Sequence, residues 1–313
     1  MIVVDHLTKR YGEKTAVNDL TFTVNPGVVT GFLGPNGAGK STTMRMIVGL
    51  DHPAAGSVTV NGRAYVDHVA PLHQVGALLE ARAIHPGRSA YNHLLTLATT
   101  TGIPRRRIDE VLDLVGLSAV GRKPAGAFSL GMGQRLGIAA ALLGDPDVVI
   151  LDEPVNGLDP EGILWIRGLL RSLADEGRTV FISSHLISEI ALVADHLVVI
   201  GRGELIADTS VSELQRAASG VVVQVRTPRA EDLARLLLDD DVTVTTDDVP
   251  GHLLVTGIDA ARIGDAALAA GIPIHALIPT EVSLEEAFMR LTRDAVEFHP
   301  GDTAHHPEEV TAR

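Results

Sequence analysis

The stretch Gly34-Pro35-Asn36-Gly37-Ala38-Gly39-Lys40-Ser41-Thr42 decides the fold of this chain. It follows the apolar run 28–33 and leads into a helix-like segment, 42–50. In this setting the pattern GxxxxGK[ST] binds phosphate, because tightly folded backbone N–H groups and the positive end of the helix dipole both face the anion. Lys40 is then expected to reach the β- and γ-phosphates of a nucleotide, and the Ser41 hydroxyl to bind Mg²⁺. A glycine-rich turn that matches the pattern by chance is the alternative.

The composition excludes several other classes of protein. The net charge of −13 opposes a nucleic-acid partner, because phosphate backbones are bound by concentrated Lys and Arg. With no cysteine, the chain has no disulfide, iron–sulfur cluster or thiol catalysis. Its apolar runs are shorter than the ~18 residues of a membrane span. The first six residues lack the basic region and long apolar core of a signal peptide, so we expect the protein to stay in the cytoplasm.

A second candidate site follows the apolar run 147–151. Continuous apolar runs are typical of strands buried on both faces of a parallel sheet. Asp152 and Glu153 come directly after this run and are expected at the carboxyl edge of the sheet, where open α/β folds bind ligands. Asp152 is placed to hold Mg²⁺ through its water shell, and Glu153 to polarise an attacking water. An isolated Asp-Glu pair would otherwise indicate a solvated turn.

His185 is a third candidate at the same edge, because it follows the expected strand 179–183. There it can touch a γ-phosphate, although a single histidine at a strand end is more often structural.

The order of the elements predicts an α/β core with an inserted helical lobe and a second, smaller domain. Apolar spacing predicts strands and helices. In the first domain, 1–216, strands are expected at 2–8, 21–24 and 57–60, a helix at 160–175, a hairpin at 197–207, and lobe helices at 89–101, 104–115 and 131–143, within a lobe of about 72–143.

The second domain is expected to span 217–297, with a disordered tail at 298–313. Its expected strands are 221–226, 242–246, 252–256 and 273–278, and its expected helices are 229–239, 259–270 and 283–293. This order of elements fits a split βαβ sandwich of the α+β class.

Together these motifs resemble the nucleotide-binding subunits of ABC transporters, which are P-loop NTPases, over residues 1–216. The resemblance implies that the chain binds ATP and Mg²⁺ and hydrolyses ATP. It implies that Tyr11 stacks on adenine, that Glu153 is the catalytic carboxylate and that His185 is the switch histidine. Asn156-Gly157-Leu158-Asp159 resembles the D-loop of this family, and Phe128-Ser129-Leu130-Gly131-Met132 occupies the place of its signature sequence.

The signature is also physically intelligible, because Ser129 is a good helix N-cap and the free N–H groups behind it form an anion site. The resemblance implies that two subunits close head to tail, so that each Ser129 helix end meets the γ-phosphate held by the other subunit's Lys40. The second subunit is expected to be another copy of this chain, although a different ATPase subunit stays open.

Two motifs depart from the common family pattern. Leu130 replaces the first glycine of the signature pair and Met132 replaces its glutamine, while Glu80 stands where most members have the Q-loop glutamine. Both variants resemble the subgroup of bacterial ATPases for drug and peptide-antibiotic resistance. A carboxylate at position 80 can still bind Mg²⁺. In such a family residues 80–100 would flank the groove that receives a helix of the membrane subunit.

The second domain resembles the accessory domain of the same subgroup, including the stretch Ser283-Leu284-Glu285-Glu286-Ala287-Phe288. We interpret it as a domain that stabilises the dimer. A regulator or an assembly platform for the permease is the alternative.

The leading hypothesis is therefore an ATPase subunit that drives an exporter of a drug, antibiotic or lipid-like compound. Nothing in the chain can cross a bilayer, so an integral membrane permease is required, and the subunit is expected at the inner face of the membrane through that partner. A soluble ABC ATPase acting on ribosomes or DNA is the alternative. A third possibility is a P-loop kinase, although Ser129, Glu153 and His185 favour water as the nucleophile.

Overall fold

The computed structural model describes residues 1–80, 84–218, 221–238, 242–246, 249 and 251–281. These residues form two compact units, Met1–Ser210 and the part of Val211–Arg290 that ends at residue 281. The division falls a few residues before the expected domain boundary at 216/217. The expected tail 298–313, the expected helix 283–293 and the stretch 283–288 lie outside the described residues.

The first unit is built on a six-stranded sheet with the order β5-β6-β7-β3-β8-β9. Neighbouring strands from β5 to β8 run parallel, and β9 pairs antiparallel with β8. The strands are β3 Val29–Leu33, β5 Val75–Leu78, β6 Val148–Leu151, β7 Thr179–Ser184, β8 His196–Gly201 and β9 Glu204–Ser210. Every residue of β3, β6 and β7 is buried, and in β6 this burial explains the unbroken apolar run 148–151.

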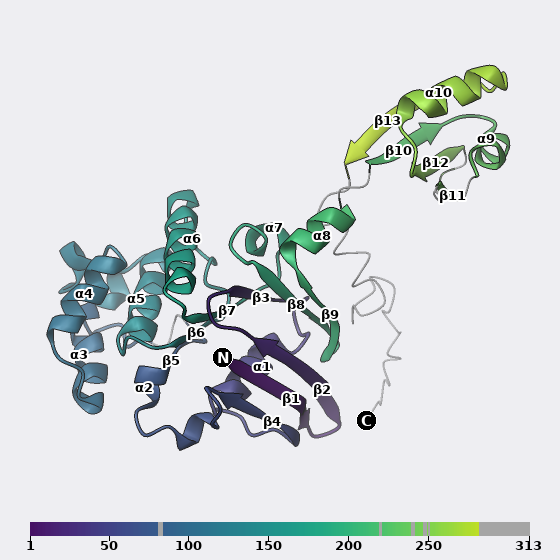
Figure 1. The fold of residues 1–313 in the computed structure, drawn as a ribbon. Coiled ribbons are helices and arrows are strands. Elements are labelled where there is room, and N and C mark those ends of the chain that lie inside the picture. The colour runs from purple at the N-terminus through teal and green to yellow at the C-terminus, as the bar shows by residue number, and fades with distance from the viewer. Residues whose placement is uncertain (81–83, 219–220, 239–241, 247–248, 250, 282–313) are drawn as a thin grey trace, which may run out of the picture. The chain divides into compact units, whose positions relative to one another are not determined.

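A second, antiparallel sheet has the order β2-β1-β4 (Figure 1). Its strands are β1 Ile2–Tyr11, β2 Lys14–Val24 and β4 Ala55–Val60. The hairpin of β1 and β2 is longer than predicted, because polar residues such as Lys9 continue the pairing as far as Tyr11 opposite Lys14. One hydrophobic core contains side chains of both sheets and of helix α1, Lys40–Ile47.

Three aromatic rings join the two sheets in this core. Phe22 of β2 lies 5.5 Å from Phe32 of β3 and 5.8 Å from Phe181 of β7, measured between ring centroids. Phe32 and Phe181 are 5.2 Å apart. The tilted rings lie within the separation at which aromatic pairs attract.

The remaining helices of the first unit pack on the six-stranded sheet or on one another. They are α2 Pro71–Gln74, α3 Ala90–Thr101, α4 Arg106–Leu114, α5 Leu130–Leu142, α6 Pro160–Asp175 and α7 Ile187–Ile190, with 3₁₀ turns at Tyr65–Asp67, Ser118–Val120 and Ala125–Ala127. Helices α6 and α7 pack on β3 and β7, and α5 packs on β5 and β6. Helices α3, α4 and α5 gather at one side of the unit (Figure 1).

The predicted helical lobe, about 72–143, begins later than expected, so its predicted start is wrong. Residues Val75–Leu78 form β5, a strand of the core sheet, because this short apolar run pairs in register with β6 from Val75 opposite Val148 to Leu78 opposite Leu151. The helical lobe therefore follows β5.

The second unit contains a four-stranded antiparallel sheet in the order β11-β12-β10-β13. Its elements are α8 Val211–Ala218, β10 Val221–Arg226, α9 Ala230–Leu237, β11 Thr243–Thr246, β12 His252–Thr256, α10 Ala260–Ala269 and β13 Ala276–Glu281. Strand β12 lies between β10 and β11, which confirms the split βαβ prediction.

The last strand of this sheet begins later than predicted. Pairing starts with Ala276 opposite Arg226, whereas 273–275 form a connection in which the Pro273 carbonyl accepts a hydrogen bond from the Thr227 hydroxyl (2.8 Å). Pro273 lacks an N–H group for strand pairing, which favours this connection.

Replacement of Phe181 tests the aromatic contact between the sheets. Phe181 is fully buried, so we expect Phe181→Ala to lower the free energy of unfolding by about 3–5 kcal/mol through the cavity that it leaves. Urea denaturation followed by the fluorescence of Trp165, the only tryptophan, measures this change. Leu50→Ala is the control, because Leu50 is 61% exposed, and its expected effect is within about 0.5 kcal/mol. Equal effects of the two substitutions would contradict the prediction.

Candidate active site

The glycine loop connects β3 to α1, as its pattern predicts. Helix α1 begins at Lys40 after Gly39, whose φ of 106° is left-handed and whose position has no room for a side chain: a Cβ atom there would lie 2.6 Å from the Ala16 carbonyl oxygen. No side chain caps this helix, so an anion can accept hydrogen bonds from its first N–H groups.

Lys40 lies inside this loop and is only 7% exposed. Its ammonium donates hydrogen bonds to the carbonyl oxygens of Gly34 (2.7 Å) and Pro35 (3.3 Å). Its Nζ atom is 3.9 Å from Oε1 of Glu153. Burial lowers the pKa of Lys40, and the carboxylates of Glu153 and Asp152 oppose that shift. The loop therefore keeps a cation among phosphate-binding N–H groups.

The Asp152 carboxylate joins two other segments at the carboxyl edge of the sheet. Its Oδ2 accepts a hydrogen bond from the Ser41 hydroxyl (2.6 Å), and its Oδ1 accepts one from the Ser183 hydroxyl at the end of β7. Ser41 and Asp152, predicted to share a metal site, thus lie together.

The oxygens of Ser41 and Asp152 fit a magnesium ion. The Ser41 hydroxyl gives its proton to Asp152 and keeps its lone pairs for a metal. Mg²⁺ in nucleotide sites is usually held by one or two protein oxygens plus phosphates and water. Among the described residues no group of three or more His, Asp or Glu side chains forms a metal site, so a self-sufficient protein cage is absent there.

Glu153 adopts a left-handed backbone conformation, with φ at 50°, which is uncommon for a residue with a side chain. Two side chains hold its main chain: its N–H donates to the Ser183 hydroxyl (2.9 Å), and its carbonyl accepts from Nε2 of Gln134 (3.2 Å). Its Oε2 lies 3.0 Å from Nδ1 of His185. The two predicted catalytic residues are therefore in contact.

Ser183 and Gln134 were not among the predicted site residues. Gln134 lies within the expected helix 131–143 and Ser183 within the expected strand 179–183, and neither was assigned a role. A serine in a buried strand gives little indication of function by itself, whereas its place two residues before His185 is a pattern that can be searched for.

The signature residues form the start of α5. Ser129 is the N-cap, and its hydroxyl accepts a hydrogen bond from the Met132 N–H (3.2 Å), as predicted from its residue type. Leu130 is 49% exposed and packs against Gly157 of the D-loop, where a Cβ atom would overlap the Leu130 side chain. The left-handed φ of Gly157, 77°, further favours glycine there.

Asp159 caps the neighbouring helix α6. Its Oδ1 accepts a hydrogen bond from the Gly162 N–H (2.9 Å), and Pro160 occupies the first turn. Because Gly157 also contacts Leu130, the start of α6 is joined to the start of α5.

One cationic and one aromatic side chain connect α5 and α6 further along these helices. The Arg135 guanidinium of α5 stacks 4.2 Å from the Trp165 ring centroid of α6. Both side chains also donate to carbonyls at the end of α4, Arg135 to Val115 (3.0 Å) and Trp165 to Leu114 (3.2 Å). The signature helix is thus fixed to both the lobe and the core.

Tyr11, the predicted adenine-stacking residue, ends β1 and is 49% exposed. Its hydroxyl donates to Oδ2 of Asp51 (3.1 Å), which also accepts from Nε of Arg45 (2.7 Å). The Lys9 ammonium lies 5.0 Å from the ring centroid. The stacking role stays a prediction.

Glu80 does not join the Ser41 and Asp152 pair: no hydrogen bond or ion pair links it to either side chain in the described part of the chain. It is exposed and lines a groove of about 430 Å³ between the core and the lobe. The other lining residues are Arg45, Val48, Leu50, Tyr65, Leu72, Val75, Ala77, Leu78, Leu79, Ile84, His93, Gly137 and Ala140.

Comparison with known proteins identifies the family. The model of the ABC transporter family matches residues 17–156. The bacitracin transport ATP-binding protein BcrA of Enterococcus faecalis is 42% identical over 219 residues, which are 69% of this chain and 71% of that protein. The chain belongs to the ABC transporter ATP-binding family. The expected resemblance and the P-loop NTPase fold are thereby confirmed.

Other ABC proteins agree with this assignment. The lantibiotic transport ATP-binding protein SrtF of Streptococcus pyogenes is 38% identical over 208 residues, 66% of this chain and 90% of that protein. A dimeric ATP-binding cassette solved in a post-hydrolysis state with ADP and Pi is 25% identical, with a TM-score of 0.61 over 67% of this chain and 99% of that one. The chain is an ABC ATPase that binds ATP.

The second unit matches a different family model. Residues 221–285 match a domain of unknown function, DUF8746. In the described part of this ABC ATPase, none of the helices has the length and apolar content that a membrane crossing needs.

Ser183 provides a test of the site geometry. Ser183→Ala removes the hydroxyl that bonds both Asp152 and the Glu153 N–H, so we expect kcat for ATP hydrolysis to fall about ten- to a hundredfold. Ser183→Thr keeps a hydroxyl and should retain most of the activity. Ser188→Ala, an exposed position on α7, should leave kcat unchanged. Steady-state phosphate release measures all three, and a wild-type kcat in Ser183→Ala would contradict the proposed arrangement.

Proposed function

We propose that this chain is the ATP-hydrolysing subunit of an exporter and drives transport through a separate membrane permease. The observation that carries the proposal is the convergence of Lys40, Asp152 and Glu153 at one sheet edge, with His185 bonded to Glu153. Family membership supports it, because the matched family is that of ABC transporters. Through the permease the subunit would lie at the inner face of the membrane.

In this mechanism the chain binds the nucleotide and orients water. The loop N–H groups and Lys40 hold the β- and γ-phosphates and offset the charge that develops on them. Glu153 orients or deprotonates a water for in-line attack, and His185 contacts the γ-phosphate. A bond forms between the water oxygen and phosphorus, and the bond to the bridging oxygen breaks as ADP leaves with the electron pair. Magnesium, held through Ser41 and Asp152, would neutralise phosphate oxygens.

The working unit in this proposal is a dimer. Ser129 and the first N–H groups of α5 would meet the γ-phosphate bound by a second subunit, which we take to be another copy of this chain. The dimeric form of the solved cassette with ADP and Pi supports the arrangement. Asp159 and Gly157 would lie at the same contact, because the D-loop packs against the signature.

The groove at Glu80 is the proposed contact with the permease. It lies between β5 of the core and α5 of the lobe, and its lining combines apolar side chains such as Leu72 with the charged Arg45 and Glu80. An amphipathic helix is the kind of partner that fits such a surface.

The exported compound is proposed to be a peptide antibiotic. Two relatives are bacitracin and lantibiotic transport ATP-binding proteins. The second unit is proposed to stabilise the dimer.

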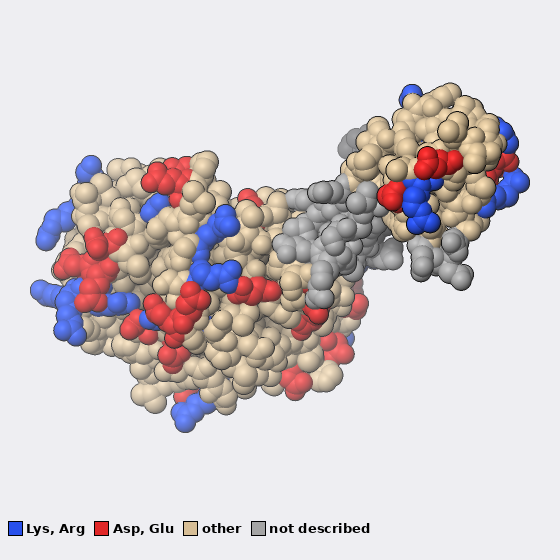
Figure 2. Space-filling view, turned by 45° about the horizontal axis from the view of Figure 1, so that its top comes forward, with Lys and Arg blue, Asp and Glu red and all other residues tan. Residues whose placement is uncertain are grey.

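An ABC ATPase that acts on ribosomes or DNA is the less favoured function. The net charge is −13, and the face in Figure 2 shows acidic and basic side chains interspersed, without a continuous basic surface. Nucleic-acid binding requires such a surface.

Glu153→Gln tests both the chemistry and the partner. The substitution keeps the shape of the side chain but removes its charge, so we expect ATP binding to persist, the dimer to stay closed and kcat to fall about 10²–10⁴-fold. A tagged Glu153→Gln chain would be purified from its native host in mild detergent with ATP and Mg²⁺, and its partners identified by mass spectrometry.

Lys40→Ala is the control for that capture, because it should lose ATP binding and therefore ATP-dependent partners. A polytopic membrane protein in the eluate is the expected result. Ribosomal or DNA-bound partners without a membrane protein would overturn the exporter proposal, and normal turnover would overturn the role of Glu153.

Glu80→Gln tests the role of the groove. Because Glu80 is exposed at the groove and not bonded to Ser41 or Asp152, we expect ATP affinity within about twofold of wild type and altered transport in vesicles that contain the permease. Asp109→Asn, at an exposed lobe position away from the groove, is the control and should change neither quantity. Unchanged transport by Glu80→Gln would refute the coupling role.

A further inference from the structure

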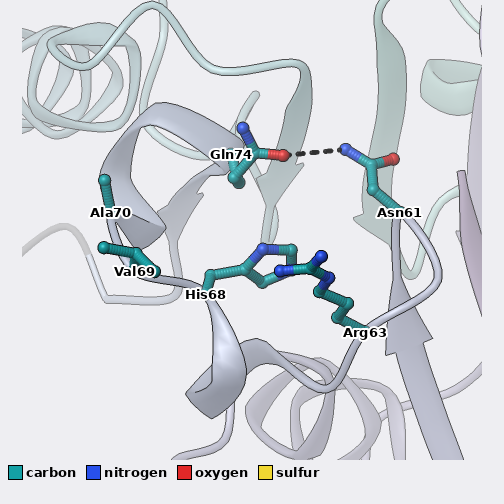
Figure 3. Close-up of a pocket in the computed structure, with 6 residues that line it drawn as sticks. All are labelled: Asn61, Arg63, His68, Val69, Ala70 and Gln74. Carbon is teal, nitrogen blue, oxygen red and sulfur yellow. Dashed lines mark hydrogen bonds between the residues drawn. The ribbon is translucent and has the colours of Figure 1, made fainter.

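A second pocket lies at the amino edge of the six-stranded sheet, opposite the nucleotide site. It has a volume of about 340 Å³ and is lined by Asn61, Arg63, His68, Val69, Ala70 and Gln74 (Figure 3). Gln74 directly precedes β5, whose first residue pairs with the first residue of β6, whereas Asp152 follows the last residue of β6. The pocket therefore shares no residue with the active site.

A tight turn gives this pocket a fixed base. Asn61 and Gly62 both have left-handed backbones, with φ of 49° and 79°, and Val60 and Arg63 exchange backbone hydrogen bonds across them. The Val60 carbonyl also lies 3.0 Å from Nε2 of His68. Arg63 and His68 are thus held by the same strand end.

The hydrogen bonds around the pocket leave donors without acceptors. The Met1 nitrogen can only donate, and it bonds Oδ1 of Asn61 (2.8 Å). This fixes the orientation of the Asn61 amide, whose Nδ2 then donates to Oε1 of Gln74 (3.3 Å; Figure 3). Both amide oxygens are therefore occupied, and the Gln74 Nε2 group is left as a donor without an acceptor among the described residues.

Arg63 adds a positive charge to these donors. Its guanidinium has no hydrogen bond or ion pair with any described residue, and no Asp or Glu lines the pocket. Its side chain is exposed, so an anion can reach it from solvent. In Figure 3 the Arg63 side chain extends from the turn toward the side of the pocket where His68 lies.

We propose that this pocket binds a small oxyanion, a carboxylate or phosphate group, through Arg63 and the Gln74 amide. The planar guanidinium presents paired N–H donors that match either group. Val69 and Ala70 also line the pocket, and both are exposed, so the pocket is open to solvent on that side. The volume is at the lower end of the range of small-molecule sites. The site is independent of the proposed transport function.

An NMR titration of the full chain tests this site. The phosphate loop is first filled with Mg²⁺ and a non-hydrolysable ATP analogue, so that the added anion cannot bind there. Inorganic phosphate or acetate is then added at constant ionic strength with chloride as reference. The side-chain ¹H–¹⁵N signals of Arg63 and Gln74 are followed after assignment with Arg63→Gln and Gln74→Glu.

Saturable shifts of both signals are expected with phosphate, acetate or both, and the active anion identifies the head group. Arg63→Gln should weaken binding, observed at Gln74, about ten- to a hundredfold. Arg106→Gln, which removes an exposed charge on α4, should leave it unchanged. Gln74→Glu can still accept from Asn61, so it should keep the fold, while its negative charge repels the anion and abolishes binding.

Three outcomes would overturn the proposal. They are signals that do not move, shifts that chloride reproduces, and equal affinities in the Arg63→Gln and Arg106→Gln chains.

Discussion

The carboxylate of Asp152 is the point on which the geometry of the active site depends. It accepts hydrogen bonds from Ser41 of α1 and Ser183 of β7, so three segments that are distant in sequence meet at one side chain. The meeting is possible because β3, β6 and β7 run parallel and end at the same edge, with Leu151 opposite Ile182 and Leu33 opposite Ser184. A shift in strand register would separate these groups.

The charges around the phosphate loop explain why the proposed mechanism includes a metal ion as well as a nucleotide. Lys40 is a single buried cation close to the carboxylates of Glu153 and Asp152, and its pKa is lowered by burial despite them. A nucleotide adds several negative charges to a site that already contains two carboxylates. Backbone N–H groups and the helix dipole supply only partial positive charge. In the proposed mechanism a divalent cation held by Ser41 and Asp152 would offset the remainder, which is the usual role of Mg²⁺ in phosphoryl transfer.

The sequence predicted those parts of the site that depend on local chemistry. The loop, the carboxylates after an apolar strand, and the cap Ser129 follow from residue type and position. Helix α6 matched its predicted bounds because Asp159 and Pro160 begin it and Gly177 follows its end.

Contacts between distant segments were not predictable in the same way. Ser183 and Gln134 gain their roles only when β6, β7 and α5 come together. Strand β5 was missed because four apolar residues fit a helix as well as a strand.

The groove, the signature helix α5 and Glu153 form one connected body. Leu78 and Gly137 line the groove, and a Cβ atom on Gly137 would lie 2.6 Å from Leu78, so α5 and β5 are in close contact. The same helix holds the Glu153 carbonyl through Gln134 and stacks on α6 through Arg135. If the proposed partner displaced α5 from the groove, the support of Glu153 would change directly, because a tightly packed interface moves as a unit.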